Sequence, residues 1–216
     1  MIEQLTKDAI TLLKTLIETQ SFSSEEDNTA THIETWFTRC DIDFKRTKNN
    51  VWAVNKHFEA GKPPLLLNSH HDTVRPNKAY TRDPFAASIE DGKLFGLGSN
   101  DAGGPLVSLL STFVHFYAQE DLPYNIIIAA SAEEETAGPL SLSGLLPELP
   151  TIDLAVVGEP TLLDMAVAEK GLLVYDAVVK GTPSHAAHPN EDNAILNTVE
   201  VLEWFKNVQF EKVSET

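Results

Sequence analysis

The chain has 216 residues, which is enough for one or two domains with hydrophobic cores of their own. Its 16 Lys and Arg residues against 32 Asp and Glu residues give a formal net charge of −16, so we expect no nucleic-acid partner and no anionic membrane partner. Cys40 is the only cysteine, which excludes an intrachain disulfide and favours a reducing, cytoplasmic location.

The first part of the chain predicts two amphipathic helices. The N-terminal segment has no basic region before an apolar run, so we expect no secretion signal. Apolar residues recur at helical spacing over residues 5–16 and again over residues 30–40. Ser23 followed three residues later by Glu26 matches a capping box at the start of the second helix.

Three short apolar runs predict buried strands, at residues 65–67, 126–130 and 154–157, with the middle run as a central strand. Between them, Asp91-Gly92 predicts a hairpin turn, residues 103–119 a buried helix and residues 140–146 a short helix. This alternation is typical of an α/β domain, for which we expect a mixed central sheet flanked by helices over residues 1–165.

The pattern changes after about residue 162. Residues 172–180 alternate between apolar and polar positions, which predicts a strand with one wet face, and residues 193–207 predict a helix. We therefore expect residues 166–216 to begin a second, α+β domain that is incomplete at Thr216.

Each predicted buried strand is followed by residues of the types that bind metal ions. His70 and Asp72 follow the first strand, Glu133–Glu135 follow the second and Glu159 follows the third. In open α/β sheets ligands bind at the carboxyl ends of the strands, and histidine with carboxylates suits a zinc-like ion. A further acidic residue, Asp101, lies among the glycines of residues 96–104.

Each of these motifs by itself is more often an exposed pair, a solvated acidic run or a helix cap. The glycine cluster does not fit phosphate binding, because Asp101 stands where a dinucleotide fingerprint needs glycine and a Walker lysine is absent. The conjunction carries more weight, since like charges at neighbouring strand ends repel unless cations neutralise them.

Four motifs, SHHDTV, GLGSNDAGG, SAEEE and VGEP, resemble the co-catalytic zinc peptidase family that includes acetylornithine deacetylase, succinyl-diaminopimelate desuccinylase and carboxypeptidase G2. The run AEKGLLVYDAVVKGTPSHAAH resembles the acetylornithine deacetylase branch in particular. The resemblance implies a catalytic α/β domain interrupted by a ferredoxin-like α+β lid, a homodimer formed through that lid, and two zinc ions with water between them. It also implies a cis peptide bond after Asp101.

The resemblance also implies a role for each matching position. The metal ligands would be His70 and Glu159 for one ion, Glu135 for the other, and Asp101 as the bridge between both. Glu134 would be the general base, Asp72 would orient the His70 imidazole, and His185 would help to stabilise the oxyanion. His71 and His188 have no such counterpart, and we expect them to be exposed or to lie behind the ligands.

The implied reaction is amide hydrolysis of a small N-acyl amino acid, with N-acetyl-L-ornithine first and N-succinyl-ornithine as its variant, in arginine biosynthesis. Zinc is the expected metal, with cobalt or manganese as substitutes. Two alternatives stay open: another aminoacylase or dipeptidase of the same family, and a truncated metal-binding chain without activity. Family members run longer and place a late histidine beyond the position of Thr216, so we expect at most one tightly bound zinc and negligible activity from this chain by itself.

Overall fold

A computed structural model describes residues 2–168 and 171–209 of the chain. The chain divides into two compact units, Met1–Met165 and Ala166–Thr216, and each is described separately. In the described residues, no helix combines the length and the apolar character needed to cross a membrane.

The first unit is built on a mixed five-stranded sheet with the order β1-β2-β6-β3-β7. These strands are β1 (Lys45–Thr47), β2 (Asn50–Val54), β3 (Pro64–His70), β6 (Asn125–Ser131) and β7 (Leu154–Val157). β3 runs parallel to both β6 and β7, whereas β2 is antiparallel to β6 and to β1. A separate hairpin pairs β4 (Ser88–Glu90) with β5 (Lys93–Phe95) around the predicted Asp91-Gly92 turn.

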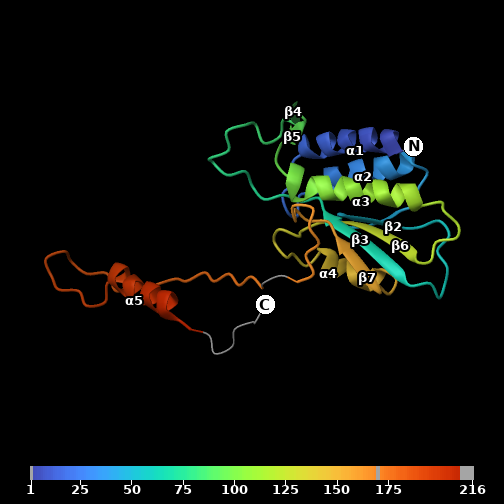
Figure 1. The fold of residues 1–216 in the computed structure, drawn as a ribbon. Coiled ribbons are helices and arrows are strands. Elements are labelled where there is room, and N and C mark those ends of the chain that lie inside the picture. The colour runs from blue at the N-terminus through green and yellow to red at the C-terminus, as the bar shows by residue number, and fades with distance from the viewer. Residues whose placement is uncertain (1, 169–170, 210–216) are drawn as a thin grey trace. The chain divides into compact units, whose positions relative to one another are not determined.

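Helices cover both faces of this sheet (Figure 1). On one face lie α1 (Ile2–Ile17), α2 (Asp27–Arg39) and α3 (Gly104–Phe116), the last preceded by the short helical segment η1 (Ser99–Gly103). On the other face lie α4 (Leu142–Leu145) and the single turn η2 (Leu146–Glu148). The two predicted N-terminal helices and the predicted helix over residues 103–119 are thereby confirmed, the last with shorter bounds.

The central strand β6 separates two hydrophobic cores. Ile126 and Ile128 pack with the three long helices, whereas Ile127 packs with Trp52 and with Leu145 of α4. Successive side chains of a strand point to opposite faces, so a continuous apolar run buries both sides of β6. All seven residues of β6 are buried, as the prediction of a central strand requires.

Three sequence-based expectations for this unit are wrong or incomplete. β7 forms at the predicted place but is an edge strand, and its residues are exposed rather than buried. The predicted Ser23–Glu26 capping box does not form, because α2 has Glu26 itself as N-cap and the Ser23 hydroxyl donates to Asp72 at 2.7 Å. Strands β1 and β2 were not predicted, since three and five residues are too short to show a clear alternation.

The second unit contains α5 (Ala194–Asn207), which confirms the predicted helix over residues 193–207. The side chain of Asn193 caps it by accepting from the N–H groups of Ile195 and Leu196. The predicted strand over residues 172–180 is wrong, because those residues form no regular structure. A strand needs a neighbour to satisfy its backbone groups, and none of the described residues pairs with this segment.

The two-sided burial of β6 makes a stability prediction. We expect Ile128→Ala, at a position with 0% exposure, to lower the free energy of unfolding by about 2–5 kcal/mol, because it leaves a cavity between β6 and the helices. Ile89→Ala, on β4 with 54% exposure, is the matched control and should change it by less than about 0.5 kcal/mol. Urea unfolding followed by circular dichroism measures both values, and equal effects would contradict this account of the core.

Candidate metal centre

The site lies at the carboxyl ends of the three parallel strands. His70 is the last residue of β3, and its register partner on β6 is Ser131, two residues before Glu133. On the other side of β3, β7 ends at Val157, two residues before Glu159. Parallel pairing in this register therefore delivers a histidine and two acidic segments to one edge of the sheet.

Asp101 reaches the same place from η1, the segment that leads into α3. Gly98 precedes this segment with φ 72°, and a Cβ there would lie 2.6 Å from Cγ2 of Thr73, so glycine is required for the turn. The peptide bond Asp101–Ala102 is cis, as the resemblance implies. This turn directs the Asp101 carboxylate towards His70.

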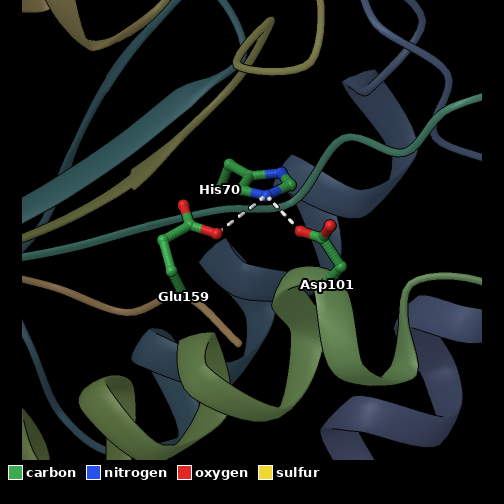
Figure 2. A group of neighbouring side chains, drawn as sticks. All are labelled: His70, Asp101 and Glu159. Carbon is green, nitrogen blue, oxygen red and sulfur yellow. Dashed lines mark hydrogen bonds and ion pairs between the residues drawn. The ribbon is translucent and has the colours of Figure 1, made fainter. Parts of the chain in front are cut away.

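His70, Asp101 and Glu159 converge on one point (Figure 2). Nε2 of His70 lies 3.2 Å from Oδ1 of Asp101 and 3.9 Å from Oε2 of Glu159. One possible ligand atom from each residue lies within 4.8 Å of the other two. Among the described residues, Glu135 is not part of this group. Burial, and after it the charge of Asp101, raises the pKa of its carboxyl group.

Asp72 holds the site from behind. Its side chain is fully buried, and its backbone carbonyl accepts from Nδ1–H of His70 at 3.0 Å while its carboxylate lies 3.3 Å from the same nitrogen. With Nδ1 carrying the proton, Nε2 can face the two acidic side chains. The same carboxylate accepts from the N–H groups of Glu134 and Glu135 at 3.1 and 3.2 Å.

The acidic triplet 133–135 splits into one inward and two site-facing side chains. Glu133 is buried, and its carboxylate accepts from the Ser24 hydroxyl and from the N–H of Leu140. Glu134 is half-exposed and brings Oε2 to 3.9 Å from Nε2 of His70. The triplet is therefore not a solvated run, and its first residue fixes the turn that carries the other two.

The pKa values report crowded negative charge. Burial opposes the charge on His70, but the hydrogen bond and charge of Asp72, with the charges of Glu159 and Glu134, outweigh it and raise the pKa to about 9. Burial, followed by the charge of Asp101, raises the pKa of Glu135. Burial also raises the pKa of Glu159, and the neighbouring carboxylates add to this.

The remaining predicted histidines have separate places. Of the two alternatives expected for His71, exposed or behind the ligands, the first is wrong. His71 is buried, with Nδ1 at 2.9 Å from the Thr29 hydroxyl and Nε2 at 2.9 Å from the Asn49 carbonyl. Burial lowers the pKa of His71. His185 and His188 lie in the second unit, where both are exposed, and the role of His185 stays a prediction.

The donor set at the converging point fits a divalent metal ion. One imidazole nitrogen and carboxylate oxygens match the ligand chemistry of zinc and of other borderline first-row ions. Burial raises the pKa values of Glu135 and Glu159, and the neighbouring carboxylates add to this effect. A bound cation would neutralise this surplus of carboxylates over cationic groups.

Comparison with known proteins agrees with this geometry. The family model for peptidase family M20/M25/M40 matches residues 66–213 of the chain. The chain belongs to this family. A probable succinyl-diaminopimelate desuccinylase from Staphylococcus aureus strain Mu50 is 29% identical over 221 aligned positions, which cover 97% of this chain and 53% of the relative. The chain thus spans about half the length of the curated relatives it matches.

Solved structures show the M20 fold. Human carnosine dipeptidase 1 aligns with a TM-score of 0.59 at 20% identity, over 73% of this chain and 39% of its own. The M20 metallo-carboxypeptidase Sso-CP2 from Sulfolobus solfataricus aligns with a TM-score of 0.57 at 23% identity, over 69% of this chain and 37% of its own. The predicted family and the predicted mixed α/β fold are both confirmed.

The contacts of Asp72 make a prediction for the protein stripped of metal with a chelator. We expect Asp72→Asn to lower the pKa of His70 from about 9, because it removes the charge and the hydrogen bond that favour the imidazolium. A pH titration of the imidazole by NMR measures this change. Asp91→Asn, in the exposed β4–β5 turn, is the control and should leave the titration unchanged.

The same shift sets the pH dependence of stability. The folded pKa of His70 lies above its ordinary 6.5, so its stabilising contribution is complete below about pH 6.5 and is lost as pH rises through about 9. In Asp72→Asn this fall should be smaller. A variant that loses stability between pH 6.5 and 9 as steeply as the parent protein would show that other carboxylates hold the proton.

Proposed function

We propose that the protein hydrolyses the amide bond of a small N-acyl amino acid in a metal-dependent reaction. The observation that carries the proposal is the convergence of His70, Asp101 and Glu159 at the strand ends, with the half-exposed Glu134 beside them. A bound divalent ion at such a site supplies Lewis-acid polarisation of the amide carbonyl and makes water more acidic. His70, Asp101 and Glu159 would hold this ion, and Glu135, beside Asp101, would hold a second.

Glu134 is the proposed general base. Its carboxylate faces the same imidazole nitrogen as the ligands but is half-exposed, so water and substrate can reach it. It would take a proton from the attacking water and deliver it to the leaving nitrogen, the usual work of a positioned carboxylate. Asp72 would keep His70 in one tautomer and orientation, and His185 would assist at the oxyanion.

The substrate has two candidates. The relative from Staphylococcus aureus is named as a probable succinyl-diaminopimelate desuccinylase, which favours a succinyl group on a diamino acid. The run over residues 168–188 resembles the acetylornithine deacetylase branch, which favours N-acetyl-L-ornithine and a step of arginine biosynthesis. Both are N-acyl diamino acids, and we place the succinyl substrate first because the named relative aligns with 97% of the chain.

Zinc is the proposed metal, with cobalt or manganese as substitutes, and the second unit is the proposed lid through which two copies pair. A cytoplasmic site of action is consistent with the single Cys40. An M20 chain that binds metal without turning over substrate is the competing proposal, which activity and metal content together can decide.

The base assignment makes the sharpest prediction. In the protein carrying this sequence, Glu134→Gln should keep its metal content and lower kcat by about 10²- to 10⁴-fold, because it removes a general acid–base group. Elemental analysis and turnover of each N-acyl diamino acid measure the two quantities. Glu25→Gln, an exposed carboxylate paired with Arg75, is the control and should change neither. Loss of metal in Glu134→Gln would exchange the roles of Glu134 and Glu135.

A second experiment tests the substrate class. The protein is supplied with zinc, cobalt or manganese and offered N-succinyl-diaminopimelate, N-acetyl-L-ornithine and an unblocked dipeptide. We expect turnover of an N-acyl diamino acid and loss of both metal and turnover in His70→Ala, because that variant removes the only imidazole of the converging group. Preference for the unblocked dipeptide would identify a dipeptidase, and stoichiometric metal without turnover would support the competing proposal.

A further inference from the structure

We propose that Glu26 is a positioning residue for Glu134, acting through the backbone of the acidic turn rather than by contact with metal or substrate. This inference rests on the proposed role of Glu134 as the base. Its evidence is a buried hydrogen-bond network that joins the loop before α2 to residues 133–135.

Glu26 is a fully buried carboxylate whose known partners are all N–H donors. Oε1 accepts from the N–H of Ser24 at 2.7 Å and from the N–H of Glu133 at 3.1 Å. Oε2 accepts from the side-chain amide of Asn49 at 2.8 Å. These three N–H donors compensate for the removal of the carboxylate from water.

Two buried carboxylates thereby hold three successive N–H groups. Glu26 accepts from residue 133, and Asp72 accepts from residues 134 and 135. Glu133 has φ 53°, a left-handed conformation that is uncommon for residues other than glycine, so this turn depends on partners outside it. Removing the Glu26 anchor frees the N–H of the Ala132–Glu133 peptide, one residue before Glu134.

The hydrogen bonds of Asn49 fix which end of its side-chain amide faces Glu26. Its Oδ1 accepts from Nη2 of Arg46 at 3.2 Å, which leaves its NH₂ group to face Glu26. The backbone carbonyl of Asn49 lies 2.9 Å from Nε2 of His71, which adds a third contact to those with Arg46 and Glu26. The amide at position 49 therefore cannot turn round to suit a different group at position 26 without losing Arg46.

The Glu26 network reaches the residue before the base but not the converging residues. His70, Asp101 and Glu159 come from β3, η1 and the segment after β7, and none of them contacts Glu26 directly. A change at Glu26 should therefore move the turn that carries Glu134, and with it Glu135, while His70, Asp101 and Glu159 stay in place. This separation of turnover from metal content distinguishes positioning from general support of the fold.

The test is a double-substitution cycle in which the double variant keeps the net charge of the parent protein. Glu26→Gln turns one donor towards another donor, and Asn49→Asp turns one carboxylate towards another, so each single variant breaks the pair. In the double variant the hydrogen bond between positions 26 and 49 is restored with donor and acceptor exchanged. The amide at position 26 donates to the carboxylate at position 49, which still accepts from Arg46. Glu25→Gln, one residue earlier and exposed, is the control.

Two readouts are measured on every variant. In the metal-loaded protein we expect each single substitution to lower kcat by about 10- to 100-fold with unchanged KM, and the double substitution to recover most of it. The ion held by His70, Asp101 and Glu159 should be retained in every variant. In the protein stripped of metal we expect faster hydrogen exchange at the Glu133 amide in the single variants, with protection recovered in the double variant.

Three outcomes would overturn the inference: wild-type kcat and wild-type exchange in Glu26→Gln, loss of the ion held by His70, Asp101 and Glu159 in parallel with turnover, or no recovery in the double variant. If the parent protein hydrolyses none of the offered substrates, the proposed function fails. The hydrogen-exchange cycle still decides whether Glu26 holds the turn that carries Glu134.

Discussion

One buried carboxylate, that of Asp72, connects the histidine of the metal centre to the acidic turn. Its side chain has no access to solvent, so protein groups must supply all of its hydrogen bonds. They come from three places: the Ser23 hydroxyl before α2, the His70 imidazole at the end of β3, and two N–H groups after β6. A group that costs so much to leave unsatisfied fixes these three segments against one another.

The sheet supplies the frame on which this constraint acts. β3 lies between β6 and β7 and is parallel to both, so strand register brings His70 and the segments after β6 and β7 to one edge, where the loops then orient the acidic side chains. The two cores on either face of β6 hold that register, because a slip of one residue would exchange Ile127 and Ile128 between them. The positions of the strand ends at the site therefore depend on the packing of the two hydrophobic cores.

Much of the fold and several site residues could be predicted from the sequence. β6 and α3 were predictable because their apolar runs are long, and the strand ends pointed to His70 and Glu159 as residues of one edge. The sequence predicts a local capping box between Ser23 and Glu26, whereas two of the three partners of the Glu26 carboxylate lie 23 and 107 residues away and could not be predicted from a local signal. Residues 172–180 show the reverse case, in which a correct alternation has no partner strand among the described residues.

The parallel arrangement of β3 with its neighbours also bears on how the protein folds. The contacts that close the centre span 31 residues from His70 to Asp101, 62 from Asp72 to Glu134 and 89 from Ser69 to Gly158. Contacts of high sequence separation form only after chain entropy has been lost elsewhere, which slows the search for them. The candidate metal centre therefore cannot assemble from local contacts, and its acidic residues meet through pairings as long in sequence as those that join the strands of the sheet.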